Sequence, residues 1–145
     1  MDWRAIGQRR ETAILLVEDD EVDVLGFRRA LRSLRIANPV TVARDGIEAL
    51  QILRGERGPY PRPHLIVLDL NLPRMNGIEL LRELRADPKL CDSVVFVLTT
   101  SRAEQDRVDA YRLNVAGYMV KSDPGASFLA AVTMLDHYWR VVELP

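Results

Sequence analysis

The chain has 145 residues, of which 48% are hydrophobic and 28% are charged, and its formal net charge at pH 7 is −1. This length fits one domain with one core, and so small a net charge gives no general attraction to nucleic acid or to anionic membranes. The apolar runs have the length of a strand, and residues 1–12 lack the apolar stretch of a secretion signal. We therefore expect a soluble cytoplasmic protein that binds neither DNA nor membrane, with an extension over 1–12 and one domain over 13–145.

Strand-like and helix-like segments alternate along the chain. Apolar, β-branched runs predict strands, and apolar residues at helical spacing between capping residues or prolines predict helices. The predicted strands are residues 13–18, 39–43, 65–69, 94–98 and 116–120. The predicted helices are residues 21–36, 46–54, 77–86, 102–113 and 126–142. Clustered glycines and prolines predict a loop over 55–63.

This alternation predicts an α/β fold made of successive βα units. Right-handed crossovers between parallel strands leave few topologies, and we expect a doubly wound five-stranded parallel sheet in the order 2-1-3-4-5, with helices on both faces. In that order the first and third strands flank the point where the winding reverses. Ligands of open α/β sheets bind in the crevice at this point, so the residues that end these strands are the first candidates for a site.

Polar residues end four of the predicted strands. Glu18 and Asp19 follow the first strand, Asp69 follows the third, and Thr99 and Lys121 follow the fourth and fifth. Crowded like charges are unfavourable without a cation, and ligands that are all oxygen suit a hard divalent ion such as Mg²⁺. A metal and an ammonium together neutralise a phosphoryl group, which a carboxylate can accept as nucleophile. This edge of the sheet therefore suits phosphoryl transfer.

With these groups in this order, the chain resembles the receiver domains of bacterial two-component response regulators, which have a flavodoxin-like fold, over essentially its whole length. The resemblance implies a response regulator of a phosphorelay that accepts a phosphoryl group from a sensor histidine kinase and signals by a conformational switch. It implies slow self-hydrolysis and no enzymatic turnover on other substrates. The implied site consists of Asp69 as phosphoacceptor, Thr99 and Lys121 as phosphoryl contacts, Thr99 and Tyr118 as switch residues, and Glu18, Asp19, Asp69 and the main-chain carbonyl of Asn71 as Mg²⁺ ligands.

Within this family the chain is similar to stand-alone regulators that are paired with bacterial phytochrome kinases, which implies a bacteriophytochrome partner. The similarity rests on the long loop at 55–64, the Lys121-Ser122 pair and the tail from Tyr138-Trp139 to Pro145. Receivers usually have proline after the lysine. Because Ser122 stands there, the cis or trans state of that peptide bond is left open.

The first predicted helix carries a basic stripe. Arg28, Arg32 and Arg35 share one helical face, with Arg29 beside them. A solubilising face is the more common meaning of such a stripe. In receivers, however, this helix helps to dock the phosphohistidine domain of the kinase, and the hypothesis that the stripe contributes to docking follows from the resemblance.

The last predicted helix is unusually apolar. It carries two stripes, one with Phe128, Val132, Leu135, Trp139 and Val142 and another with Ala131, Met134, Tyr138 and Val141. A surface helix normally has a single apolar stripe, so we expect the second stripe to be exposed. It predicts a homodimer through this helix, together with the fifth strand and the fourth helix, unless residues 1–12 cover it.

Three other functions remain as alternatives. A phosphatase of the haloacid-dehalogenase type also uses a strand-end aspartate, but it needs an acid two positions later, where this chain has Asn71. A nucleotide-binding module would need a glycine-rich motif after the first strand, which is absent. An adaptor that works without phosphorylation would not need the full set of acids, hydroxyl and lysine.

Overall fold

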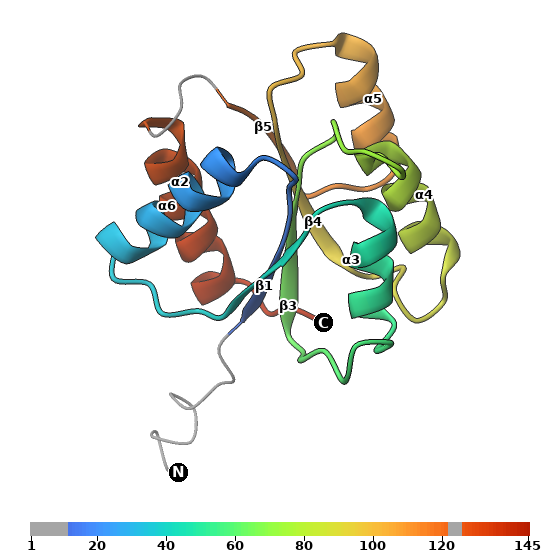
Figure 1. Cartoon of the computed structure of the whole chain (residues 1–145), viewed down its shortest axis with the longest axis horizontal. Coiled ribbons are helices and arrows are strands. Elements are labelled where there is room, and N and C mark those ends of the chain that lie inside the picture. The colour runs from blue at the N-terminus through green and yellow to red at the C-terminus, as the bar shows by residue number, and fades with distance from the viewer. Residues whose placement is uncertain (1–11, 122–125) are drawn as a thin grey trace.

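The computed structural model describes residues 12–121 and 126–145 and the side chains of these residues except 126 and 127. With the labels of Figure 1, the strands are β1 (Ala13–Val17), β2 (Val40–Ala43), β3 (His64–Leu68), β4 (Val94–Thr99) and β5 (Gly117–Val120). The helices are α2 (Glu21–Ser33), α3 (Gly46–Leu53), α4 (Gly77–Ala86), α5 (Glu104–Arg112) and α6 (Ala126–Val141). The extension predicted for residues 1–12 lies, apart from Thr12, outside the described residues, as does Ser122. Within the described ranges, no helix has the length and hydropathy needed to cross a bilayer.

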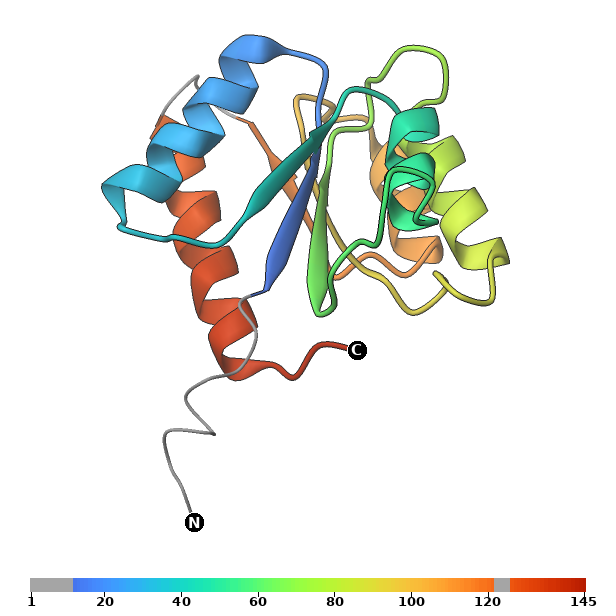
Figure 2. The same cartoon turned by 60° about the horizontal axis from the view of Figure 1, so that its bottom comes forward.

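The strands form one parallel five-stranded sheet in the order β2-β1-β3-β4-β5, as the sequence predicts. Figures 1 and 2 show α3, α4 and α5 on one face of this sheet and α2 and α6 on the other. Each face has its own cluster of buried apolar residues. The central strands β1 and β3 are therefore covered on both sides, which explains why they read as continuous apolar runs.

Side chains of the two central strands alternate between these clusters. Leu15 and Ile66 pack beneath α3, α4 and α5, whereas Ile14 and Leu65 pack beneath α2 and α6. All four are fully buried. The parallel register aligns the last residues of β1 and β3, so the residues that follow the two strands emerge side by side at the same edge of the sheet.

Helix α2 ends three residues earlier than predicted, at Ser33. Arg35 has a left-handed φ of 55°, and the N–H of Ile36 donates to the carbonyl of Leu31, which closes the helix end. This reversal lets Ile36 pack against the core. The prediction that Arg35 continues the basic face of the helix is therefore wrong, because it lies beyond the last turn. The other ends of the predicted elements lie within two residues of the observed ones.

The prediction that α6 exposes a whole second apolar stripe is also wrong. Ala131 of that stripe is buried, and the ring of Tyr138 packs edge-to-face on Phe96 with centroids 4.8 Å apart. Helix α6 contacts both the sheet and α2, so it buries a wider arc than a helix on a flat surface. Among the described side chains of the helix, the large apolar ones that are exposed are Leu129, Met134 and Val141.

Candidate functional site

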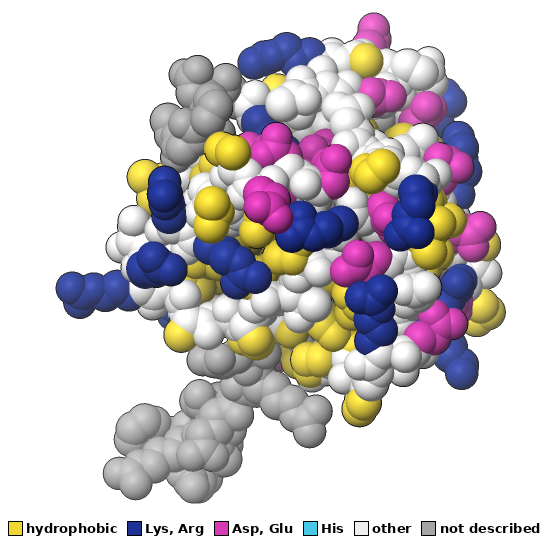
Figure 3. Space-filling model, in the orientation of Figure 1, with side chains coloured by type: hydrophobic (Ala, Val, Ile, Leu, Met, Phe, Trp, Pro, Cys, Tyr) yellow, Lys and Arg dark blue, Asp and Glu magenta, His cyan; other side chains and the backbone are white. Residues whose placement is uncertain are grey.

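Three acids meet where β1 and β3 end. Glu18 extends the β1–β2 pairing through its N–H, which donates to the carbonyl of Ala43, and Asp69 extends the β1–β3 pairing by donating to Val17. The side chains of Glu18 and Asp69 are buried, and Asp19 is exposed. One carboxylate oxygen from each acid lies within 4.8 Å of the others. Figure 3 shows acidic side chains gathered over this region, with basic side chains along α2.

This cluster fits a divalent cation. The Oε2 atom of Glu18 is buried and has no hydrogen-bond partner among the described residues. A buried carboxylate oxygen without a donor is unfavourable, and a cation among the three acids would satisfy it. Since every candidate ligand is an oxygen, the cluster suits a hard ion such as Mg²⁺ or Mn²⁺.

Both oxygens of Asp69 have protein partners. The hydroxyl of Thr99 donates to Oδ1 over 2.7 Å, and the N–H of Asn71 donates to the same atom over 3.1 Å. The Nζ atom of Lys121 donates to Oδ2 over 3.1 Å. Thr99, Asn71 and Lys121, which the sequence places after three different strands, thus converge on this one carboxylate.

Lys121 lies among three carboxylates. Its Nζ atom is 2.9 Å from Glu18 Oε1, 3.1 Å from Asp69 Oδ2 and 2.8 Å from Asp23 Oδ2, and only 8% of its side chain is exposed. Asp23 falls in the first turn of the helix predicted over residues 21–36, and nothing in the sequence connects it with the site. Its partner is 98 positions away, and no spacing rule indicates such a contact.

The cluster separates the pKa values of its two buried acids. Burial, together with the neighbouring carboxylates of Asp69 and Asp23, raises the pKa of Glu18 to about 9. Burial also works against ionisation of Asp69, but the neighbouring Glu18, the charge of Lys121 and the donors Thr99 and Asn71 outweigh it and lower that pKa. Without a bound cation, Glu18 is therefore protonated at neutral pH while Asp69 is ionised and available as a nucleophile.

Lys121 keeps its charge in this environment. Burial disfavours the ammonium, but hydrogen bonds with Asp23 and Glu18 and the charge of Asp69 outweigh burial and raise the pKa of the lysine. A permanently charged ammonium beside a nucleophilic carboxylate is suited to neutralising an incoming anionic group.

Tyr118 contacts the segment that follows β4 rather than the acids. Its hydroxyl donates to the carbonyl of Ser101 over 3.0 Å, while the N–H of Ser101 donates to the hydroxyl of Thr99 over 3.3 Å. Ser101 therefore connects the aromatic side chain with the hydroxyl that touches Asp69. By contrast, Asp20 is an exposed helix cap, whose Oδ1 accepts from the N–H groups of Val22 and Asp23.

Comparison with protein families finds one match, the response regulator receiver domain, over residues 14–133. This range runs from the second residue of β1 to the middle of α6. All the candidate site residues at the carboxyl edge fall inside it.

Individual relatives agree with this match. The response regulator Rcp1 of Synechocystis sp. is 38% identical over 135 residues, which are 91% of this chain and 92% of Rcp1. The Mn²⁺-bound crystal structure of Rcp1 superposes with a TM-score of 0.82 at 36% identity, covering 92% of this chain and 99% of that chain. The crystal structure of the phosphorylated cyanobacterial phytochrome response regulator RcpA superposes with a TM-score of 0.85 at 37% identity, covering 94% of this chain and 99% of that chain. The structure of the bacteriophytochrome response regulator AtBRR superposes with a TM-score of 0.73 at 36% identity, covering 93% of this chain and 99% of that chain.

Proposed function

The chain belongs to the response regulator receiver family, and from this premise we propose that Asp69 accepts a phosphoryl group in the presence of Mg²⁺. The observation that carries the proposal is the placement of donors on Asp69, with Thr99 on one oxygen and Lys121 on the other. Such donors can bind phosphoryl oxygens as these oxygens arrive at the carboxylate. Relatives with Mn²⁺ bound and in phosphorylated form have the same fold.

In the proposed reaction, a carboxylate oxygen of Asp69 forms a bond to phosphorus as the bond from phosphorus to a kinase histidine nitrogen breaks. Lys121 and Thr99 then donate to the phosphoryl oxygens. Glu18, Asp19 and Asp69, with the main-chain carbonyl of Asn71, would hold Mg²⁺, which when bound neutralises charge on the transferred group.

Release of the phosphoryl group is proposed to be slow. Rapid hydrolysis of an aspartyl phosphate needs a general base to take a proton from the attacking water, and the residue two positions after Asp69 is Asn71, whose side-chain amide cannot accept a proton. The protein then acts as a phosphoacceptor switch and not as an enzyme with turnover on other substrates.

The switch is proposed to pass through Thr99 and Tyr118. When the Thr99 hydroxyl turns from Asp69 to a phosphoryl oxygen, its contact with the N–H of Ser101 changes as well. Since Tyr118 is hydrogen-bonded to the carbonyl of Ser101, the aromatic side chain responds to the same movement.

Family membership implies a histidine kinase as partner, and we propose a cytoplasmic kinase of the bacteriophytochrome type. The support is the likeness to RcpA and AtBRR, which are described as phytochrome and bacteriophytochrome response regulators. We propose that Arg28, Arg29 and Arg32, all exposed on α2, contribute to docking. Reversing the charges of Arg28 and Arg32 should slow transfer from the kinase and leave phosphorylation by phosphoramidate unchanged. Equal slowing of both reactions would contradict this role.

We also propose a homodimer through α6, together with β5 and α5. It would cover the exposed apolar side chains Leu129, Met134 and Val141. Sedimentation should find a dimer for the wild type and a monomer for a variant with Leu129→Glu and Met134→Glu. Tyr138 and Trp139 are unsuitable positions for this test because they pack against the core. A wild type that stays monomeric at tens of micromolar would contradict the dimer.

The proposed phosphorylation is tested by intact-mass spectrometry after incubation with phosphoramidate or acetyl phosphate. The wild type should gain one phosphoryl group with Mg²⁺ and none with EDTA. Asp69→Asn should gain none, whereas Asp20→Asn should behave like the wild type, because Asp20 caps α2 outside the cluster and asparagine caps equally well. Phosphorylation of Asp69→Asn at the wild-type rate would overturn the proposal.

A further inference from the structure

The contact between Asp23 and Lys121 is not explained by the roles assigned so far. At 2.8 Å it is the shortest of the three contacts that the Lys121 ammonium makes with carboxyl groups. Both partners are largely withdrawn from solvent, with 19% of the Asp23 side chain exposed and 8% of the Lys121 side chain. An ion pair at this depth is screened little by solvent, so it strongly affects where the ammonium lies.

Asp23 differs from the other two partners of Lys121. Glu18 and Asp69 are candidate cation ligands, and the group of acids within ligand distance of one another in the described residues is Glu18, Asp19 and Asp69, without Asp23. A cation in this group would share the oxygens of Glu18 and Asp69 and repel the nearby ammonium. Of the three carboxyl groups around Lys121, only that of Asp23 would not bind the cation, so its full negative charge would remain available to pair with the ammonium.

The backbone fixes both ends of this contact. The N–H of Asp23 donates to the side chain of the helix cap Asp20, and the N–H of Lys121 donates to the carbonyl of Thr99, which extends the β4–β5 pairing. Asp23 is thus held in the first turn of α2 and Lys121 directly after β5. Their side chains span the gap between the helix and the end of the strand.

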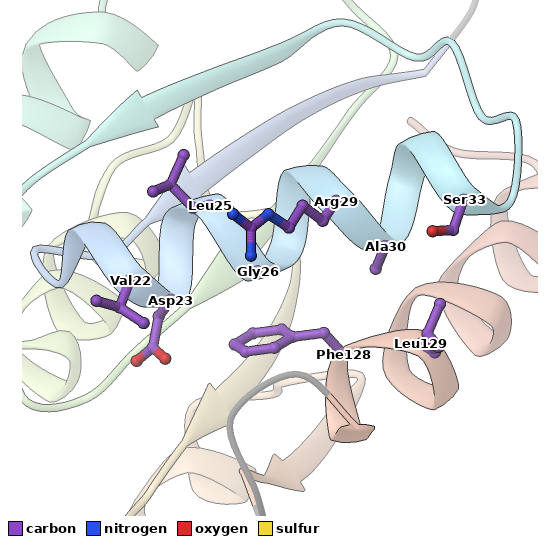
Figure 4. A pocket seen from close by; sticks show the side chains of 9 residues that line it. All are labelled: Val22, Asp23, Leu25, Gly26, Arg29, Ala30, Ser33, Phe128 and Leu129. Carbon is purple, nitrogen blue, oxygen red and sulfur yellow. The ribbon is translucent and has the colours of Figure 1, made fainter.

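Asp23 lies where α2 and α6 approach each other. Figure 4 shows its carboxylate leaving α2 on the side where the ring of Phe128 lies. A Cβ atom at Gly26 would lie only 3.1 Å from that ring, so glycine is what allows α6 to approach α2 here. Asp23, Phe128 and Lys121 line the same small cavity beneath the acidic cluster. Asp23 also lines the wider open pocket between α2 and α6, so the ion pair with Lys121, and not a lack of space, holds its carboxylate towards the site.

We propose that Asp23 is a positioning residue for Lys121, which holds the ammonium beside Asp69 while a cation occupies Glu18, Asp19 and Asp69. The inference rests on the proposed function of Asp69. It assigns Asp23 no contact with the phosphoryl group. Its part is to keep Lys121 from being driven out of the site by the cation.

The first test measures the amine of Lys121 directly and does not need phosphorylation. The chain has only two lysines, Lys89 and Lys121, so acylation by an N-hydroxysuccinimide ester is readily assigned by peptide mass spectrometry. Lys89 is exposed and serves as the internal reference. In Asp23→Asn, Lys121 should be acylated ~3–10-fold faster than in the wild type, because a lysine that has lost its shortest ionic contact leaves the buried cluster more often and meets the reagent.

The effect of Mg²⁺ on this reactivity makes the test specific. In the wild type, Mg²⁺ should change the acylation of Lys121 little, whereas in Asp23→Asn it should raise the acylation further. Glu21→Gln is the matched control, since it removes the same charge from the same helical turn but from an exposed side chain that pairs with Arg44. Acylation of Lys121 that is equal in Asp23→Asn and the wild type, or raised equally by Glu21→Gln, would overturn the proposal.

The second test measures phosphorylation by phosphoramidate at saturating Mg²⁺. The rate should fall ~3–10-fold in Asp23→Asn, be unchanged in Glu21→Gln and recover partly in Asp23→Glu, which restores the charge. A normal rate in Asp23→Asn would overturn the positioning role. If the wild type itself takes up no phosphoryl group, the proposed function fails, while the acylation result still decides whether Asp23 holds Lys121. Should Asp23→Asn fail to fold, Asp23→Ser replaces it in both tests.

Discussion

Glu18 and Asp45 are buried to nearly the same extent, with 3% and 4% of their surfaces exposed, and they are in opposite chemical situations. Asp45 accepts from the N–H of Glu48 through one oxygen and from the guanidinium of Arg74 through the other. Burial works against its ionisation, but these donors outweigh it and lower its pKa. Glu18 has a raised pKa and one oxygen without a donor among the described residues.

The comparison separates a structural carboxylate from a functional one. Asp45 caps α3 and ties the loop that follows β3 to the sheet, and all its bonds are made within the protein. One carboxylate oxygen of Glu18 has no donor among the described residues, so a bound group such as a cation must supply the missing contact. Burial alone would not have distinguished the two; the number and charge of the partners does.

The largest expected difference is in cation affinity. Glu18→Gln should weaken Mn²⁺ binding by more than the ~10–100-fold that changes outside the ligand shell produce, because it removes a direct ligand. Asp45→Asn should leave the affinity unchanged. Electron paramagnetic resonance of the free Mn²⁺ ion measures both. Equal affinities for Glu18→Gln and the wild type would remove the distinction between the two carboxylates.

The next difference is in stability without metal. Asp45→Ala should lower the free energy of unfolding by about 1–2 kcal/mol, because α3 loses its cap. Glu18→Gln should raise it at pH 7, because the wild type must protonate Glu18 on folding, whereas a glutamine of the same shape needs no proton. Urea denaturation in EDTA makes the comparison. A larger loss in Glu18→Gln than in Asp45→Ala would mean that Glu18 is the structural acid.

A third difference is in the pH dependence of stability. The folded-state pKa of Glu18, about 9, lies above its ordinary value of 4.5, so the folded state binds more protons between these values. In EDTA its contribution to stability is complete below pH 4.5 and is lost as pH rises towards 9, with a slope of at most ~1.4 kcal/mol per pH unit. Asp45, whose pKa is lowered, contributes stability above its ordinary pKa of 3.8 and loses it as pH falls further. Denaturation midpoints from pH 5 to pH 9 should fall in the wild type and stay flatter in Glu18→Gln; equal slopes would contradict the raised pKa.

Much of this site could be predicted from the sequence because it depends on topology. An apolar strand that ends in an acid predicts where that acid emerges, and the strand order then brings Glu18, Asp69, Thr99 and Lys121 to one edge. The structure brings these four side chains into direct contact. Their roles in phosphoryl transfer remain predictions.

The features that the sequence did not predict are a contact between a helix and a strand, the end of a helix and the packing of α6. Asp23 was not connected with Lys121 because helix periodicity says nothing of a contact between α2 and β5. The end of α2 depends on the left-handed backbone at Arg35, a residue type that gives no signal for it. The burial of Ala131 and Tyr138 depends on how α6 lies against α2 and the sheet, which the apolar pattern of one helix does not determine.

We expect the phosphoryl group to be carried by Asp69 and by no other acid of the cluster. Borohydride reduces an aspartyl phosphate to homoserine, and peptide mass spectrometry locates the product after phosphorylation by phosphoramidate and Mg²⁺. We expect homoserine at position 69 in the wild type and in Asp20→Asn. Reduction at Glu18, Asp19 or Asp23 instead, or none at any acid of a protein that has gained phosphate, would contradict the central claim.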